Sequence, residues 1–574
     1  MEHKVTPRLL LTSVFGPFGR RDRFADDLGM QMELFNNQIT REQGVHSLRT
    51  NFWSFSLYFL AENISIPCTV LDFPKWRDFT EELKKGYTHV GISFIQPNVL
   101  KVKRMAEFIR AKYPDMRILL GGYGASLPDL NELVPHDALC QGEGIRWLRE
   151  YFGEDPGAEI KHPVMFGVSQ KHLYGFRDVI TDSSVIFPGL GCVNRCFFCS
   201  TSHKFKDYIP FLPTGESMFS ACLEAEKKLG VSSFAIIDEN FLKVPDRAKE
   251  LLRLMEKKGK PYLFAMFSSA EAIRDLGVDF LVRLGVSAVW MGVESNKILF
   301  GKVEGIDVQA LVHELQSKGV SVISSSILFL EHHDKQALKA DVDWAISLGT
   351  DMHQFMQLIP FPGTTLYEKY VSEGKLIPKF PYTKLHGQDR LPFVHPNFLP
   401  GEAREITRRA FQKKYEADGP GVINMALTAI RGYRREIRDS KERQRGRLSW
   451  NPETLSYGQS DQSCGDPFMA MRLGRMKERA LELRPILLAG KVFSPNRACR
   501  KKAEQVRALY KETFGKPRPL DRVKSLAILG HAAVEWVRIL WSRKRAGGDL
   551  VRQPPSRRIE YRAAAPSLPE LFEG

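Results

Sequence analysis

Three cysteines in one short loop, Cys192, Cys196 and Cys199, are the residues with the clearest capacity for chemistry. Their C-x3-C-x2-C spacing brings three thiolates together, and thiolates are the soft ligands that iron–sulfur clusters require. Each thiolate can hold one iron of a [4Fe–4S] cluster, which leaves the fourth iron open to a small molecule that can receive an electron. The spacing therefore predicts a cluster with a catalytic role.

A structural zinc site and a purely structural role are the alternatives for these cysteines. Structural zinc takes four ligands, and the nearest fourth candidates are His203 and Cys222. The other cysteines are scattered, and we expect each to be buried as a small apolar side chain without forming a second cluster. So few cysteines in 574 residues indicate a reducing, cytoplasmic environment. The scattered cysteines are Cys68, Cys140, Cys222, Cys464 and Cys499.

Residues 181–370 repeat a strand–helix unit six times, which predicts a partial (β/α)6 barrel. Glycine closes most of the predicted helices, as helix C-termini favour. In barrels of this kind the chemistry lies at the carboxyl ends of the strands, and the cysteine loop follows the first strand. The strands are predicted over 185–188, 234–238, 262–266, 288–292, 322–329 and 354–359.

Motifs with acidic residues or tight turns follow three further strands of this barrel. Asp-Glu-Asn at 238–240 follows the second strand, Gly-Val-Glu-Ser at 292–295 follows the fourth, and Pro-Phe-Pro-Gly at 360–363 follows the sixth. With the cysteine spacing, these motifs resemble those of the radical S-adenosylmethionine (SAM) superfamily. The resemblance implies that SAM binds the open iron and that its reductive cleavage yields a 5′-deoxyadenosyl radical.

The same resemblance implies roles for four further side chains of the barrel. Glu294 would contact SAM, and its alternative role is a salt bridge closing the barrel mouth. Asp238 would bind SAM or orient its loop, and a helix N-cap ahead of Pro245 is the alternative. Ser268 would touch the SAM carboxylate or only shape a turn. Phe198 would stack on the adenine or pack beside the cluster.

Residues 1–155 also alternate strands and helices, which predicts a parallel sheet with helices on both faces. Their strand-end loops carry Gly121, Gly122, Gly142 and Glu143, and ligands of open sheets lie beyond the carboxyl ends of the strands. The segment resembles the cobalamin-binding domain that precedes many radical SAM barrels, which implies a bound corrinoid near these residues. The strands are predicted over 9–15, 68–73, 89–94, 117–122 and 138–142.

One departure from that resemblance concerns the histidine that ligates cobalt in some cobalamin domains. Its D-x-H-x-x-G motif is absent, because Asp351-Met352-His353 lacks the glycine and lies in the predicted barrel. Many radical SAM relatives bind cobalamin without such a histidine. A degenerate domain without a corrinoid is the alternative, and a dinucleotide site is less favoured because no G-x-G-x-x-G follows the first strand.

Charge is concentrated in the C-terminal region. Residues 421–574 hold 32 Lys+Arg against 16 Asp+Glu, so they carry the whole net charge of +16. A predicted amphipathic helix over 525–541 contains two tryptophans and precedes Arg543-Lys544-Arg545. This pattern is typical of an interfacial membrane anchor, and a core helix with a basic rim is the alternative. Nucleic acid is less favoured, since the cations flank an apolar stripe.

These observations predict an α/β protein with a Rossmann-like cobalamin-binding-type domain (1–155), a linker (156–180), a radical SAM barrel (181–370), a barrel-closing extension (371–420) and a basic helical region (421–574). Its end, from 546, is expected to be disordered. The resemblance implies a radical SAM methyltransferase that uses a [4Fe–4S] cluster, SAM and cobalamin, with a flavodoxin or ferredoxin as reductant.

The expected reaction is methylation of an unactivated carbon, on a small molecule, lipid or isoprenoid. A cobalamin-independent cyclase or C–C bond-forming enzyme is the alternative, and a cluster- or corrinoid-sensing regulator that binds nucleic acid is a remote one. The expected location is the cytoplasm, with peripheral contact at the inner membrane surface.

Overall fold

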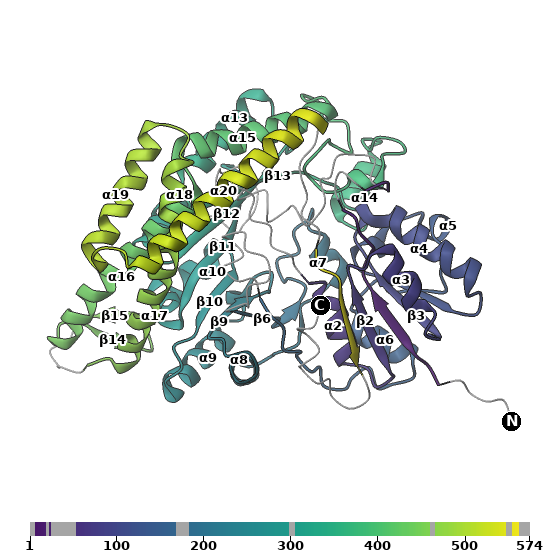
Figure 1. Ribbon diagram of the computed structural model, residues 1–574, viewed down its shortest axis with the longest axis horizontal. Helices are drawn as coiled ribbons and strands as arrows, with labels where there is room; N and C mark the ends of the chain where they lie inside the picture. Colours follow the sequence, from purple (N-terminus) through teal and green to yellow (C-terminus); the bar gives the residue numbers. More distant parts are fainter. Residues whose placement is uncertain are drawn as a thin grey trace.

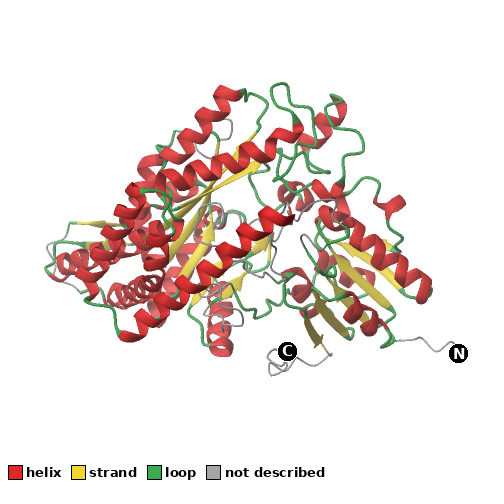
Figure 2. Cartoon of the chain, turned by 45° about the horizontal axis from the view of Figure 1, so that its top comes forward, coloured by secondary structure: helices red, strands yellow, loops and turns green. Residues whose placement is uncertain are grey.

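The computed structural model describes residues 6–18, 22–24, 53–167, 183–297, 305–459, 465–546 and 554–561. Within these residues, two six-stranded sheets stand side by side (Figure 1). The first sheet belongs to the N-terminal part, coloured purple and blue, and the second to the middle of the chain, coloured teal. Green and yellow C-terminal helices lie against the second sheet. Figure 2 shows helices on both sides of the strands, and the predicted α/β class is confirmed.

The first sheet has the strand order β16-β2-β1-β3-β4-β5, and β1 to β5 are parallel. This is a doubly wound order, in which the winding reverses between β1 and β3. Each of the five strands begins at its predicted residue and ends earlier, because the last predicted residues form strand-end loops. The strands are β1 (Leu9–Thr12), β2 (Cys68–Asp72), β3 (His89–Ser93), β4 (Arg117–Gly121) and β5 (Ala138–Leu139).

Helices cover both faces of this sheet. On one face, Leu10, Val90 and Ile118 pack against α3 (Trp76–Leu83), α4 (Val99–Lys112) and α5 (Leu130–Leu133). On the other face, Leu11 and Val70 pack against α2 (Phe55–Glu62) and α6 (Gly144–Tyr151). Phe187 and Phe211 of the middle part join this second core. The first sheet therefore shares a hydrophobic core with the second half of the molecule.

The second sheet runs β6-β9-β10-β11-β12-β13, with every pair parallel and the two end strands unpaired to each other. It is the predicted open barrel. Because all six strands are parallel, their carboxyl ends and the loops that follow them lie at one end of the sheet. The strands are β6 (Ser184–Ile186), β9 (Ser233–Ile236), β10 (Leu263–Phe267), β11 (Val286–Glu294), β12 (Ser321–Leu328) and β13 (Met352–Gln357).

The helices of the barrel have clear start and stop signals. Thr214 caps α8 through a capping box, and Gly230 ends it in the left-handed conformation at φ +67°. Asp307 and Asp334 cap α12 (Val308–Ser317) and α13 (Lys335–Ser347) with their carboxylates. The helices are α8 (Gly215–Leu229), α9 (Pro245–Lys258), α10 (Ala270–Leu276), α11 (Val278–Leu284), α12 (Val308–Ser317), α13 (Lys335–Ser347), α14 (Thr365–Ser372) and α15 (Ala403–Asp418).

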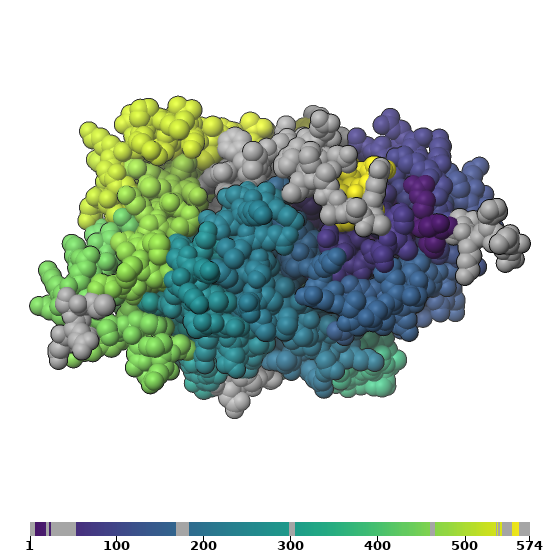
Figure 3. Space-filling model, turned by 90° about the horizontal axis from the view of Figure 1, so that it is seen from below, coloured from purple at the N-terminus to yellow at the C-terminus, as the bar shows by residue number. Residues whose placement is uncertain are grey.

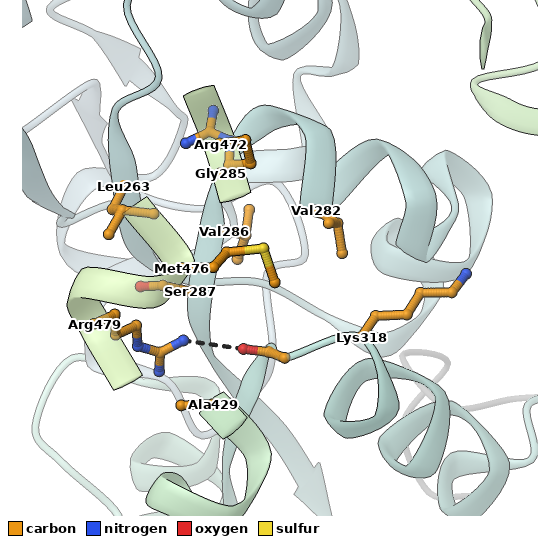
Figure 4. Close-up of a pocket in the computed structure, with 11 residues that line it drawn as sticks. Leu263, Val282, Gly285, Val286, Ser287, Lys318, Ala429, Arg472, Met476 and Arg479 are labelled. Carbon is orange, nitrogen blue, oxygen red and sulfur yellow. Dashed lines mark hydrogen bonds between the residues drawn. The ribbon is translucent and has the colours of Figure 1, made fainter. Parts of the chain in front are cut away.

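The C-terminal helices close the amino end of the barrel. Arg472 of α17 donates hydrogen bonds to the carbonyls of Tyr262 and Leu284, and Arg479 donates to the carbonyl of Gly319 at 3.0 Å. These carbonyls immediately precede β10, β11 and β12. Figure 4 shows both guanidinium groups beside a small pocket of about 20 Å³. The helices are α16 (Gly421–Gln444), α17 (Pro467–Leu483), α18 (Leu487–Val492), α19 (Arg497–Phe514) and α20 (Pro519–Ala546).

The end of the chain corrects one expectation. Residues 557–561 are not disordered but form β16 (Arg557–Tyr561), which adds to the first sheet antiparallel to β2. Arg558 forms hydrogen bonds of 2.8 and 2.9 Å with the carboxylate of Glu82, which fixes the strand at the sheet edge. Figure 3 shows its yellow atoms within the purple N-terminal part, across the molecule from the C-terminal helices. The chain therefore returns to the first sheet after forming the second sheet and the C-terminal helices.

None of the described helices, the 28-residue α20 included, combines the length and the apolarity that crossing a bilayer requires.

Candidate active site

The carboxyl ends of the barrel strands enclose a cavity of about 360 Å³, a volume typical of small-molecule sites. Residues that follow or end all six strands line it. The cavity brings together six residues singled out in the sequence: Cys192, Cys196, Cys199, Phe198, Ser268 and Glu294.

The cysteine loop projects from a short hairpin of β7 (Gly189–Leu190) and β8 (Ile209–Pro210). Gly191 has φ +86°, and a Cβ there would stand 2.2 Å from the carbonyl oxygen of Asp207, so the base of the loop requires glycine. Within the loop, the N–H of Cys199 donates to the carbonyl of Cys196 at 3.0 Å. The second and third thiols therefore share one turn, directly before α7 (Ser200–Phe205).

The three thiols suit a cluster better than a single ion. All three are partly exposed and line the cavity. Among the described residues, the ligand atoms of three His, Cys, Asp or Glu side chains converge within 4.8 Å only at His332, His333 and Asp341. The thiols are thus spread more widely than the ligands of one ion. Burial raises the pKa of Cys192 to about 11, so binding of a metal through this thiol would release a proton.

Neither candidate for a fourth zinc ligand is available. The Nδ1 of His203 donates to the carbonyl of Cys199 at 2.9 Å, and its Nε2 accepts from the N–H of Thr365 at 3.2 Å. Both ring nitrogens are therefore engaged. Cys222 is fully buried in the barrel core. The donor set of the loop is three thiols, which fits a [4Fe–4S] cluster with one open iron.

Glu294 points into the cavity from a strained turn at the end of β11. Its φ is +57°, a left-handed conformation that is uncommon for a residue with a side chain. The pairing of β11 with β12 shifts between Gly292 and Glu294, which marks a bulge. Only 8% of Glu294 is exposed. A buried carboxylate in this position can accept hydrogen bonds from ligand hydroxyl or amino groups.

Asp238 does not line this cavity, although it lines the larger cavity described below. Its carboxylate pairs with Arg247 at 2.9 Å and accepts from the hydroxyl of Tyr208 at 2.7 Å and the N–H of Asn240 at 3.0 Å. The N-cap alternative is wrong, because Val244 occupies the N-cap of α9. Asp238 instead orients the loop that follows β9.

Glu239 and Asn240 belong to the predicted Asp-Glu-Asn motif, although the sequence assigned them no separate roles. Both line the cavity. The Oδ1 of Asn240 accepts from the hydroxyl of Ser268 and the N–H of Ser269, each at 3.0 Å. Ser268 therefore has the structural partner that its turn role requires, and it still faces the cavity. Their place in the strand-end motif at 238–240 was the signal that pointed to these residues.

Phe198 both packs and lines the cavity. Its ring contacts the hydrophobic core beneath β12 and β13 and meets Phe197 edge-on at 5.4 Å. The carbonyl of Phe197 accepts from the N–H of Leu366 at 3.0 Å. This bond ties the cysteine loop to the Pro-Gly turn after the sixth strand.

A second, larger cavity of about 710 Å³ lies between the two halves of the molecule. It opens beyond the carboxyl ends of β1, β3 and β4, where the winding of the first sheet reverses and ligands of such sheets bind. Its wall is mostly apolar. The predicted cobalamin-contacting residues all line it: Gly121, Gly122, Gly142 and Glu143.

These four residues differ in how they shape the cavity. Gly122 has φ +87°, and a Cβ there would stand 2.4 Å from the carbonyl oxygen of Phe94, so the turn requires glycine. A Cβ on Gly142 would meet nothing within 4 Å. The carboxylate of Glu143 caps α6 by accepting from the N–H groups of Ile145 and Arg146. Glu143 therefore shapes the rim through the helix it caps.

The two cavities meet at a common wall. Glu239 and Phe267 line both of them. The helix after the cysteine loop bridges the halves, because the Nζ of Lys204 donates to the carbonyl of Gly122 at 3.0 Å and the hydroxyls of Thr201 and Tyr123 lie 2.8 Å apart. Groups bound in the two cavities would therefore be neighbours.

His353 is no candidate for a cobalt ligand. It is fully buried on β13, where its ring lies between the hydroxyls of Ser324 and Ser326. It lines neither cavity. Within the described residues, no histidine lines the larger cavity.

Comparisons with known proteins agree with this architecture. No protein-family model matches the chain. The chain is 22% identical over 201 residues to an uncharacterized methyltransferase, PH0819, of Pyrococcus horikoshii, a match that covers 34% of this chain and 43% of the relative. It is 21% identical over 206 residues to the cytidylyl-2-hydroxyethylphosphonate methyltransferase of Streptomyces wedmorensis, covering 34% and 38%. The chain thus spans about two-fifths of the length of these relatives.

Solved structures cover more of the chain. TsrM, a radical SAM methyltransferase of Kitasatospora setae with tryptophan and the SAM analogue aza-SAM bound, matches with a TM-score of 0.50 and 15% identity, over 82% of this chain and 99% of TsrM. A second TsrM structure, with cobalamin and a [4Fe–4S] cluster, matches with a TM-score of 0.49. The chain therefore shares the fold of TsrM. In this chain a doubly wound domain precedes an open six-stranded barrel.

Proposed function

We propose that this protein is a cobalamin-dependent radical SAM methyltransferase that methylates an unactivated carbon. The observation that supports the proposal most strongly is the shared wall of the two cavities. The cysteine loop and Glu294 line the smaller cavity, the glycine-rich loops of the first sheet line the larger one, and Glu239 faces both. TsrM, which has this fold, binds the corresponding cofactors.

The residues present fit these groups. Cys192, Cys196 and Cys199 would hold the cluster, and Glu294 would accept hydrogen bonds from SAM. The larger cavity, with its apolar wall at the switch point of the first sheet, would hold the corrinoid. When bound, the cluster and SAM supply a carbon-centred radical, and cobalamin supplies a methyl group.

The protein's own part in the reaction is to bind, orient and exclude water. Phe198, Ile327 and Leu358 give the smaller cavity an apolar lining that shields a radical from solvent. Glu239 places a carboxylate where the two cavities meet, in a position to accept a proton from a substrate bound between them. The paired Asp238 and Arg247 hold the loop that carries Glu239.

Anaerobic reconstitution tests the proposal. Purified protein is loaded with iron, sulfide and hydroxocobalamin, desalted, and analysed for bound iron and corrinoid absorbance. After reduction with dithionite in the presence of SAM, we expect formation of 5′-deoxyadenosine or S-adenosylhomocysteine. A full cluster without bound corrinoid would exclude the cobalamin-dependent reaction, and absence of both products would exclude the enzyme.

We further propose that the enzyme docks on anionic membranes through α20 and draws a lipid or isoprenoid substrate from them. The helix packs on α18, where Ile528 shares a hydrophobic core with Ala489, and both Ile528 and Ala532 are buried. It exposes an unusually large set of apolar side chains, of which Val523 is 63% and Trp541 is 55% exposed. The region 421–574, to which the helix belongs, carries the basic excess of the chain. The exposed set is Leu520, Val523, Leu526, Val534, Trp536, Val537, Leu540 and Trp541.

Vesicle sedimentation tests this docking. The V523S/V537S variant removes two exposed valines of α20, and V371S/V394S removes two equally exposed valines elsewhere. We expect binding to phosphatidylglycerol vesicles, weaker binding to phosphatidylcholine vesicles, and loss of binding only in the α20 variant. Equal sedimentation of both variants with the unaltered protein would contradict the proposal.

A further inference from the structure

A buried hydrogen-bond network lies behind Glu294, on the side away from the cavity. Asp341 of α13 accepts from the hydroxyl of Ser295 at 2.7 Å and from the N–H of Asn296 at 3.1 Å, one bond to each carboxylate oxygen. Ser295 and Asn296 are the two residues that follow Glu294. Asp341 is 3% exposed and Ser295 is 2% exposed. The helix α13 thus holds the backbone directly after the site carboxylate.

His333 completes this network. Its Nδ1 accepts from the N–H of Leu330 at 3.1 Å, so the ring proton lies on Nε2, which donates to Asp341 at 2.8 Å. Burial opposes ionisation of Asp341, but hydrogen bonds from His333, Ser295 and Asn296 outweigh it and lower its pKa. The carboxylate therefore stays charged and keeps accepting.

The cluster of His332, His333 and Asp341 has the composition of a metal site, but its atoms are otherwise engaged. Both ring nitrogens of His333 and both oxygens of Asp341 already have partners within the protein. An ion there would break at least the bond from His333 to Asp341. His333 and Asp341 are instead arranged to stabilise the turn at Glu294.

We propose that Asp341, oriented by His333, is a positioning residue that holds the Glu294 carboxylate in the SAM-binding orientation. Glu294 adopts a left-handed backbone, and the N–H of Ser295 turns back to the carbonyl of Val293 at 2.8 Å. Such a turn persists only where its surroundings hold it. Asp341, which lies 46 positions after Ser295 in the sequence, accepts two of the hydrogen bonds that hold this turn.

This inference rests on the proposed function, since it assumes that Glu294 contacts SAM. Asp341 lines neither cavity, so it would contact neither the cluster nor SAM directly. Because its hydrogen bonds go to the residues after Glu294, its substitution should change the affinity for SAM and not the iron content. The substitution Asp341→Asn keeps the shape of the side chain and replaces one acceptor with a donor, which cannot accept from Ser295 or His333. Asp343→Asn is a matched control, since Asp343 lies on the same helix and pairs with Lys339 at the surface.

Equilibrium dialysis of SAM against cluster-loaded protein, with bound iron and the melting temperature as checks, tests the proposal. We expect D341N to weaken SAM binding about 10-fold, D343N to leave it unchanged, and Ser295→Ala to weaken it in the same direction. In an E294Q background, D341N should add no further loss, because both act through one carboxylate.

The outcomes separate the two proposals. Unchanged SAM affinity in D341N and S295A, with reduced affinity in E294Q, would overturn the positioning role alone. An additive loss in the double variant would also overturn it. Unchanged SAM affinity in E294Q would instead show that Glu294 does not contact SAM, and would refute the assignment of this site. Should D341N lose iron or fold poorly, S295A decides the question, since it removes one hydroxyl and leaves Asp341 paired with His333.

Discussion

The carboxylate of Glu294 lies directly over Gly292, and a Cβ built on Gly292 would stand 2.4 Å from its Oε1 atom. A side chain at Gly292 would therefore have to displace the carboxylate of Glu294 from its present position. The glycine leaves the space into which the carboxylate turns above the cavity.

Substituting Gly292 should therefore act through Glu294. In G292A the new methyl group would displace the carboxylate, and loss of its hydrogen bonds to SAM would weaken binding about 10-fold, equivalent to about 1.4 kcal/mol. Dialysis of SAM against the loaded protein measures this. Gly401, where a Cβ would meet nothing within 4 Å, provides the control G401A. Equal affinities in the two variants would show that Glu294 accommodates the methyl group.

Cluster content should depend on the loop cysteines alone. C192A, C196A and C199A each remove one of three ligands, so we expect reconstituted protein to lose the absorbance of the cluster and most of its iron. Cys222 is buried in the barrel core, so C222A should keep a full cluster. Iron retention in H203A would confirm that His203 only holds the loop, whereas iron loss there with normal folding would indicate a histidine ligand.

Adjacent acidic residues after β9 should respond differently to substitution. D238N leaves the guanidinium of Arg247 buried without its charged partner, which should cost about 3–5 kcal/mol of unfolding free energy. E239Q changes an exposed residue of the cavity wall, so stability should change far less while product formation falls. Urea unfolding and the product assay measure the two effects. A destabilisation of E239Q as large as that of D238N would contradict these roles.

Attachment of the C-terminal strand should weaken in acid. Burial opposes ionisation of Glu82, but hydrogen bonds from Arg558, Tyr87 and Lys85 outweigh it and lower its pKa to about 2. Because Glu82 ionises more readily folded than unfolded, its contribution is present above its ordinary pKa near 4.5 and is lost as the pH falls from there towards 2.

The variant E82Q tests this contribution. It should lower stability near pH 7 by about 2 kcal/mol and flatten the dependence of stability on pH below 4.5. E81Q, which alters an exposed neighbour paired with Lys84, should keep the acid dependence of the unaltered protein. Urea midpoints at pH 7 and pH 3.5 provide the comparison, and parallel acid losses in both variants would rule out Glu82 as the source.

Many strands and motifs of this protein could be predicted from short stretches of sequence. The strands could be predicted because apolar runs bounded by glycine turns depend on neighbouring residues only, as β1 to β5 show. The placement of the cysteine loop and the Gly292–Glu294 turn at the carboxyl ends of strands could be predicted because each motif is contiguous and follows a strand. Parallel strands then bring their following loops to one end of the barrel.

Contacts between distant segments were decided only by the tertiary structure. Asp238 is held by Tyr208, which lies 30 residues away in the sequence, and by Arg247 of the next helix, whereas Glu239 faces the smaller cavity. The strand at 557–561 was missed because its partner Glu82 lies 476 residues away, and its own sequence is short and basic. The support of Glu294 by Asp341 likewise has no local signal. Sequence thus determined which residues can do chemistry, and long-range packing determined which of them face the cavities.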